Sequence, residues 1–144
     1  MAVFRELTIM GRSFMSNIDP SIYVDLVGKP FVSGDRGPNS FDCYGVLLEI
    51  YKRQGVNLRD SAYNSADKFK QFSSGICEWE PTDVQPGVTV AFRSGNIYHC
   101  GYMISRDRFI HADEGVGCVV ISRLNGGALP KKFAFIGAYK PKGK

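Results

Sequence analysis

Long runs of apolar residues are absent from the sequence. No stretch approaches the ~20 apolar residues of a membrane-spanning helix, which excludes an ordinary helical membrane protein. Residues 1–16 also lack the uninterrupted apolar core of a signal peptide, because Arg5, Glu6 and Arg12 lie among their apolar residues. We therefore predict a chain that is made in the cytoplasm, without an export signal and without a membrane span.

Cysteine and histidine are also scarce. The chain has 4 cysteines, which form no CxxC pair, and 2 histidines. The wide spacing of the cysteines argues against a disulfide framework or a zinc ribbon, so we expect reduced thiols. Zinc bound by Cys43, Cys100 or Cys118 together with both histidines is an alternative, although no local ligand spacing marks such a site. Cys77 and Cys118 are expected to be packing residues.

The charge excess is small and basic. The formal net charge is +4 and the pI is about 8.9. Basic residues gather toward the C-terminus, at Lys131, Lys132, Lys140, Lys142 and Lys144. We interpret them as solvated, with attraction to nucleic acid or to a charged cell wall as the alternative. No basic run is interleaved with aromatic residues, so we predict no nucleic-acid partner.

The length of 144 residues fits a single domain, since domains commonly contain ~100–200 residues. We predict an N-terminal arm or extension over residues 1–16, a catalytic domain over 17–140 and a basic tail over 141–144. The composition, with 44% hydrophobic and 22% charged residues, is typical of an ordered globular chain.

One helix is predicted with both of its ends defined. Between Cys43 and Gln54 the apolar residues recur at helical spacing, as Val46, Leu47, Ile50 and Tyr51. Asp42 or Ser40 can cap the start, and Gly55 stands at the expected stop. A shorter helix is expected earlier, over residues 20–27.

The second half of the chain has the pattern of β-structure. Short β-branched or aromatic runs are separated by turn-forming residues. These runs are Val88–Arg93, Tyr98–Ile104, Phe109–Ala112, Cys118–Ser122 and Phe133–Tyr139. The polar segment 57–82 separates them from the helix. We predict an α+β fold, in which the helix that begins at Cys43 packs on one face of a small antiparallel meander.

Cys43 is the candidate nucleophile. As the first residue of a helix it lies where unpaired N–H groups and a partial positive charge stabilise a thiolate. Its backbone N–H can also help to bind the oxyanion that forms at an attacked carbonyl. The alternative for this position is a small buried residue that packs the helix.

His99 and His111 are the candidate partners of this thiol. They lie in neighbouring predicted strands, joined by a turn near residues 105–107. If the hairpin loop has an odd number of residues, or a bulge corrects the parity, both side chains project from one face, at diagonal positions ~7–8 Å apart. His99 would then take the thiol proton and later protonate the leaving amine, while His111 orients the His99 ring.

The segments that carry these residues resemble the NlpC/P60 family of cysteine peptidases. The similarity covers residues 21–139 and includes a DC-x-G helix start, an H-x-G strand and an F-x-H-A strand in that order. The matching segments are Gly28–Phe31, Gly37–Pro38, Phe41–Val46, Val84–Gly87, His99–Ile104 and Phe109–Ala112. Phe31 departs from the pattern, since the family often has a tyrosine there whose hydroxyl reaches the active site.

The resemblance implies a papain-like NlpC/P60 fold with Cys43, His99 and His111 as catalytic residues and with no metal or cofactor. We expect Cys43, Asp42 and Tyr44 at substrate-binding or oxyanion positions. The implied substrate is the stem peptide of peptidoglycan, often cut between D-glutamate and the diamino acid. An aromatic residue at position 44 and the GPNSFDC approach resemble the branch found in phage tail proteins. Other tail proteins are then expected partners, and a virion would deliver the chain to the cell wall.

Two other kinds of function stay open. A structural or assembly protein of the tail would keep the fold and the residues without using them, and its thiol would have ordinary reactivity. A thiol acyltransferase or a deamidase acting on a protein would use the same fold with another substrate pocket.

Overall fold

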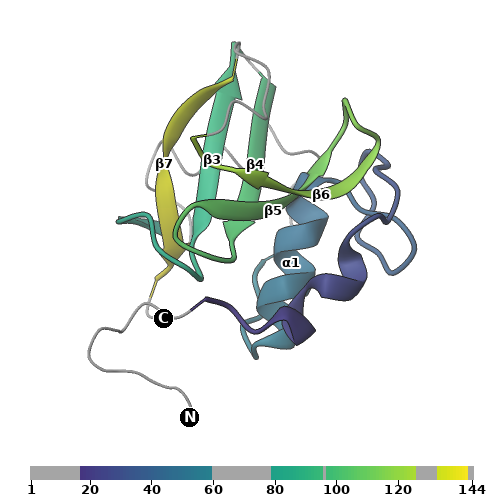
Figure 1. Cartoon of the computed structure of the whole chain (residues 1–144), viewed down its shortest axis with the longest axis horizontal. Helices are drawn as coiled ribbons and strands as arrows, with labels where there is room; N and C mark the ends of the chain where they lie inside the picture. Colours follow the sequence, from purple (N-terminus) through teal and green to yellow (C-terminus); the bar gives the residue numbers. More distant parts are fainter. Residues whose placement is uncertain (1–16, 60–78, 96, 126–132, 143–144) are drawn as a thin grey trace.

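In the part of the chain that the structure describes, one α-helix packs against a six-stranded sheet (Figure 1). The computed structural model describes residues 17–59, 79–95, 97–125 and 133–142. The elements are α1 (Cys43–Arg53), β2 (Trp79–Thr82), β3 (Thr89–Ser94), β4 (Ile97–Met103), β5 (Arg108–Asp113), β6 (Cys118–Arg123) and β7 (Ala134–Pro141). The α+β class predicted from the sequence is confirmed.

The strands lie in the order β2-β7-β3-β4-β5-β6, and all neighbours are antiparallel. Strands β3 to β6 form the predicted meander, whereas β7 returns to pair with both β3 and β2. Strand β2 was not predicted, because its sequence WEPT is largely polar and contains Pro81. A proline is compatible with a strand at the edge of a sheet, where one side has no ladder to donate to.

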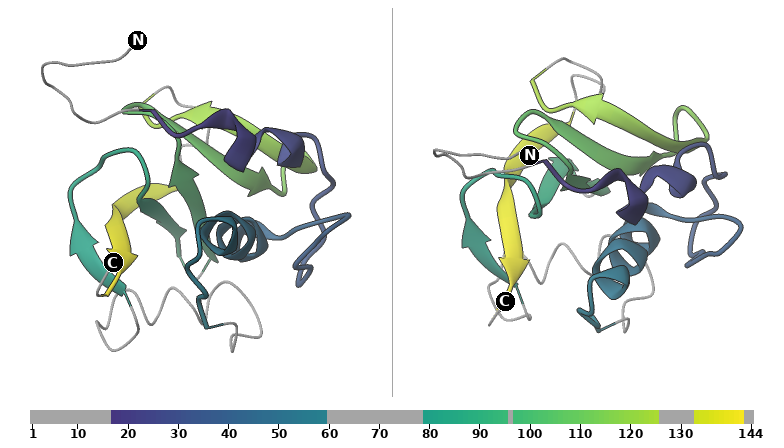
Figure 2. Two further views of the ribbon diagram at one scale, coloured as in Figure 1. Left: turned by 90° about the horizontal axis from the view of Figure 1, so that it is seen from below. Right: turned by 60° about the horizontal axis from the view of Figure 1, so that its bottom comes forward.

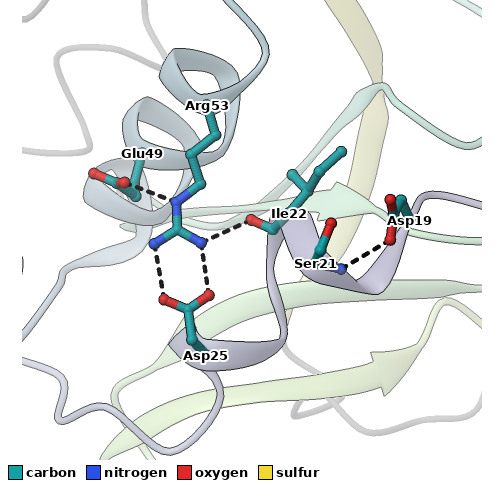
Figure 3. A network of polar contacts seen from close by, with 6 residues as sticks. All are labelled: Asp19, Ser21, Ile22, Asp25, Glu49 and Arg53. Atoms are coloured by element: carbon teal, nitrogen blue, oxygen red, sulfur yellow. Dashed lines mark hydrogen bonds and ion pairs between the residues drawn. The ribbon is translucent and has the colours of Figure 1, made fainter.

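Residues 20–26 form two short turns of 3-10 helix, where an α-helix was predicted. They are η1 (Pro20–Ile22) and η2 (Val24–Leu26). Tyr23 separates them with a φ of −138°, outside the helical range, so α-helical hydrogen bonding does not continue through it. Arg53 of α1 holds this segment by donating to the Ile22 carbonyl at 2.9 Å and to the Asp25 carboxylate at 2.6 and 2.9 Å (Figure 3).

Helix α1 presents its apolar stripe to the sheet. Its residues Val46, Leu47 and Ile50 have no exposed surface, as their spacing predicted. The helix packs mainly on β4 and β5. Figure 2 (left) shows it nearly end-on, with β5 and β6 above it and β7 to its left. It ends at Arg53, and Gly55 follows with a φ of +82°, a conformation that favours glycine at a helix C-terminus.

Side chains along β4 and β5 alternate between two faces of the sheet. The face toward α1 carries the core residues Cys100, Tyr102, Ile110 and Ala112. The other face carries Phe109, together with Phe92 of β3, in a second apolar cluster. By the same alternation His99 and His111 lie on the face of Phe109. The histidines are therefore flanked by aromatic rings, and both are buried.

Candidate active site

The start of α1 is fixed by the carboxylate of Asp42. Its Oδ1 accepts from the Gly45 amide at 2.7 Å and from Arg36 Nη1 at 2.7 Å. Its Oδ2 accepts from the Gly34 amide at 3.2 Å. Burial raises the pKa of Asp42, while the Gly45 amide and Arg36 act in the opposite direction. The structure thus gives Asp42 the role of a buried helix cap, with its oxygens turned to protein donors.

Gly45 shows why the third position of this helix has no side chain. A Cβ built there would lie 2.5 Å from the Asp35 carbonyl oxygen and 3.3 Å from the Arg36 Cα. The Asp35 carbonyl in turn accepts from the Asp42 amide at 2.9 Å, so the loop before the helix folds back over its first turn. The glycine of the DC-x-G segment is therefore required by this close approach of two backbones.

Cys43 is the first residue of α1 and is 4% exposed. Its thiol forms a hydrogen bond with the thiol of Cys100, a fully buried residue of β4. Burial raises the pKa of Cys100 well above its usual value, and the hydrogen bond with Cys43 adds to this effect. The proton of Cys100 is therefore firmly held, and its thiol can donate to the sulfur of Cys43. Cys100 follows His99 in β4, so the start of α1 contacts the strand that carries the histidine, while the side chains of Cys100 and His99 point to opposite faces of that strand.

The two histidines lie in direct contact. His99 Nε2 is 2.6 Å from His111 Nδ1, and the ring centroids are 4.8 Å apart. The pairing of Met103 with Phe109 leaves residues 104–108, an odd number, in the hairpin loop. The condition that the sequence analysis set for a common face is thus met, and the hydrogen-bonded rings are closer than the spacing of the diagonal positions suggested.

Gly101 leaves space beside the histidine pair. It stands two residues after His99 on β4, and a Cβ there would be 2.5 Å from Phe109 Cδ2, 3.0 Å from the Ile110 carbonyl oxygen and 3.2 Å from His111 Cβ. Any larger residue would clash with the Phe109 ring, which packs against His111, and would crowd the base of the His111 side chain. The glycine of the H-x-G segment is therefore required by the close approach of β5.

His111 is fully buried and contacts a third polar group. Burial, with the neighbouring His99 as a second cause, lowers the pKa of His111 to about 3. The ring is therefore neutral near pH 7. Its Nε2 lies 2.8 Å from the Oγ of Ser122 on β6. Ser122 was not predicted as a site residue; the signal available in the sequence was a polar residue at the end of the predicted strand 118–122, next to the strand of His111.

Tyr44 is buried beside the loop that precedes α1. Its side chain has no exposed surface, and its hydroxyl donates to the Arg59 carbonyl at 3.0 Å. The Arg36 guanidinium lies over its ring, 5.6 Å from the centroid. The Tyr44 side chain therefore packs the loop against α1, and the substrate-binding or oxyanion position predicted for this residue stays a prediction. Asp42, whose oxygens are used in the cap, gives no support for a substrate contact.

The remaining cysteines fall into two groups. Cys118 begins β6 and is half-buried, whereas Cys77 lies outside the described residues. Among the residues that the structure describes, no three His, Cys, Asp or Glu side chains cluster as metal ligands. Within the same residues, no helix has the length and apolar character needed to span a bilayer.

Known sequences include relatives of this chain. The model of the NlpC/P60 family matches residues 28–137. A probable endopeptidase p60 of Listeria grayi is 37% identical over 92 residues, which cover 62% of this chain and 17% of that protein. A probable endopeptidase of Haemophilus influenzae is 29% identical over 110 residues, covering 74% of this chain and 63% of that protein. The chain thus spans less than two thirds of the length of either relative.

Solved structures share the fold. NlpC2 of Trichomonas vaginalis superposes with a TM-score of 0.61 at 20% identity, over 82% of this chain and 43% of that one. A lipoprotein-like NLP/P60 family protein of Staphylococcus aureus gives a TM-score of 0.61 at 20% identity, over 92% of this chain and 45% of that one. At this level of identity the likeness concerns the fold, and it agrees with the papain-like α+β architecture predicted from the sequence.

Proposed function

Because the chain belongs to the NlpC/P60 family, we propose that it is a cysteine hydrolase that cleaves an amide bond in the stem peptides of peptidoglycan. One observation supports this most directly. The helix that begins at Cys43 meets β4 at Cys100, and the adjacent His99 forms a hydrogen bond with the buried, neutral His111. A thiol, a base and an orienting group are the parts that a cysteine hydrolase needs.

In the proposed mechanism His99 is the general base. Its Nε2 is used in the contact with His111, which leaves Nδ1 to take the proton of the Cys43 thiol. The thiolate forms at the N-terminal end of α1, where the helix dipole favours negative charge. It attacks the amide carbonyl, and His99 then gives the proton to the leaving amine. Water hydrolyses the resulting acyl-enzyme, with His99 again acting as the base.

The first turn of α1 also supplies a place for the oxyanion. The Gly45 amide is used by the Asp42 cap, and the Val46 amide donates to the Asp42 carbonyl. The Cys43 amide precedes these at the N-terminal end of α1, where the helix dipole favours negative charge. We propose that it donates to the oxygen of the attacked carbonyl, as in other sites where a nucleophile begins a helix.

The finer features of the proposal come from sequence resemblance. The DC-x-G, H-x-G and F-x-H-A segments support cleavage between D-glutamate and the diamino acid. The GPNSFDC approach to Cys43 supports a place in a phage tail, with other tail proteins as partners.

Mass spectrometry of muropeptides and cross-linked peptidoglycan tests the proposal. The parent protein is compared with Cys43→Ala and with Cys118→Ala, which removes a half-buried cysteine of β6 and serves as the matched control. We expect fragments with the parent and with Cys118→Ala, and none with Cys43→Ala. The masses identify the bond that is cut. Absence of fragments from every wall type with the parent would overturn the proposal and favour an assembly protein or transfer onto a protein substrate.

A further inference from the structure

We propose that Ser122 is a positioning residue, which holds the His111 ring in the tautomer that accepts a hydrogen bond from His99. The inference rests on the proposed function, because it concerns the proton path of the same site. It starts from a row of polar groups that crosses three neighbouring strands. His99 lies on β4, His111 on β5 and Ser122 on β6, and the two contacts in the row are 2.6 and 2.8 Å long.

The register of β5 and β6 places the hydroxyl at the second nitrogen of the ring. His111 pairs with Val120 and Phe109 pairs with Ser122, so Ser122 is diagonal to His111 on one face. Its Oγ faces Nε2, while His99 faces Nδ1. Since His111 has no exposed surface, water does not replace either partner. Both ring nitrogens of His111 therefore have hydrogen-bond partners from the protein.

Only one proton arrangement of this row leaves His99 able to act as the base. A neutral His111 carries one ring proton. If the proton is on Nε2, it is donated to Ser122, and Nδ1 accepts from His99 Nε2–H, so His99 Nδ1 is free of a proton. If the proton is on Nδ1, it is donated to His99 Nε2, and a neutral His99 then carries its proton on Nδ1, where it cannot accept one from a thiol.

The hydroxyl of Ser122 makes the productive arrangement possible in a buried site, because its oxygen accepts the Nε2 proton. Without that oxygen, a proton on Nε2 would be buried with no acceptor, a state that folded proteins avoid strongly. His111 must carry its proton on Nε2 above all after proton transfer. The imidazolium of His99 then has protons on both nitrogens and needs an acceptor at His111 Nδ1. Ser122 thus acts through His111 on the charged form of His99.

The direct test is nitrogen-15 NMR of the imidazole rings, which distinguishes the Nδ1–H and Nε2–H forms. The chain has 2 histidines, so the spectrum contains two rings, assigned with a His111→Gln variant. Ser122→Thr keeps the hydroxyl, and Ser122→Val has the same shape without it. We expect the Nε2–H form of His111 in the parent and in Ser122→Thr. In Ser122→Val and Ser122→Ala, the ratio should move about 3- to 10-fold toward Nδ1–H, the factor that one net hydrogen bond supplies.

Hydrolysis gives a second, independent readout. We expect kcat to fall about 3- to 10-fold in Ser122→Val and Ser122→Ala with KM unchanged, and to recover in Ser122→Thr. The Ile121→Val variant, at an exposed neighbouring position of β6, controls for changes in the strand itself and should keep the parent kcat.

The outcomes separate the inference from the proposed function. The NMR arm needs no substrate, so an unchanged His111 tautomer in both Ser122→Val and Ser122→Ala overturns the role of Ser122 whatever the enzyme cleaves. Equal kcat in Ser122→Thr and Ser122→Val would overturn it as well, because shape rather than the hydroxyl would then matter. Lack of hydrolysis by the parent, with the tautomer shift present, would overturn only the peptidoglycan hydrolase.

Discussion

Helix α1 is held at each end by an arginine and an aspartate, and the two pairs lie in opposite surroundings. At the N-terminal end Arg36 and Asp42 are 2.7 Å apart, and the Asp42 side chain is 5% exposed. At the C-terminal end Arg53 and Asp25 are 2.6 Å apart, and the Asp25 side chain is 56% exposed (Figure 3). Burial raises the pKa of Asp42, whereas the hydrogen bond with Arg53 lowers the pKa of Asp25.

The difference shows how one kind of ion pair performs two tasks. The exposed pair joins α1 to the 3-10 segment, and water can solvate either partner when the other is removed. The buried carboxylate serves the Gly34 amide, the Gly45 amide and Arg36 at once, and water cannot take its place. The end that carries Cys43 is therefore expected to tolerate far less change than the end that carries Arg53.

The largest effect is expected from Asp42→Ala. It leaves two backbone amides and a guanidinium without their buried acceptor, so the free energy of unfolding should fall by about 3 kcal/mol. Urea denaturation measures the loss. Asp25→Ala is the matched control at the other end and should cost about 1 kcal/mol or less. Similar losses in the two variants would contradict the comparison.

The second largest effect is expected from acid, because the free energy of unfolding should depend on the protonation of the buried His111. The pKa of His111 is lowered from 6.5 to about 3, so below pH 6.5 the unfolded chain binds a proton that the folded chain does not. Stability therefore falls as the pH falls through this window, by about 2 kcal/mol between pH 6.5 and 5. Urea titrations at several pH values measure the slope. His111→Gln should lose this part of the pH dependence; an unchanged slope would show that other groups cause it.

Two glycines near the ends of α1 allow a backbone test. Gly45→Ala puts a Cβ against the Asp35 carbonyl and should cost about 2 kcal/mol, with loss of hydrolysis because the first turn must shift. Gly55→Ala meets no atom within 4 Å, but its φ is +82°, so it should cost about 1 kcal/mol and leave hydrolysis unchanged. Thermal unfolding and the muropeptide assay measure both. Loss of hydrolysis in Gly55→Ala would contradict the distinction.

The smallest effect is expected from Arg53→Met. It removes the contacts with Asp25, Glu49 and the Ile22 carbonyl, all at the surface, and should cost about 1 kcal/mol or less at low salt. The pKa of Asp25 is lowered, so the pair contributes fully above the carboxyl's usual pKa of 3.8, and the contribution is lost as the pH falls from there through the lowered pKa of the folded state. Urea denaturation at pH 7 and at pH 3 measures the decrease. An equal cost at the two pH values would exclude the ion pair as its main cause.

The features that depend on local sequence pattern could be predicted from the sequence. The span of α1, its Asp42 cap and the stop at Gly55 follow from spacing and side-chain type, and the structure confirms them. The common face of the histidines was predicted on the condition of an odd hairpin loop, and the register of β4 and β5 meets that condition. Strand β2 could not be predicted, because its partner β7 lies far along the chain and no local pattern indicates that pairing.

The orientation of side chains and the register of the strands could not be predicted from the sequence. The burial of the Tyr44 side chain could not be predicted, because its direction depends on how the preceding loop packs on α1. Ser122 meets His111 through the register of β5 and β6, which strand propensity does not specify. The roles assigned to Cys43, His99 and His111 stay predictions until hydrolysis is measured.

Gly101 has a consequence for anyone who would transplant this site. A methyl group at this position on β4 would clash with the Phe109 ring and crowd the His111 Cβ, and Phe109 packs against His111. A graft that copied only the thiol and the histidines onto another antiparallel sheet would therefore disturb the strand that carries His111. A transplanted site must therefore include a glycine at the position of Gly101. A library that varied every residue except the three reactive ones should recover glycine at this position.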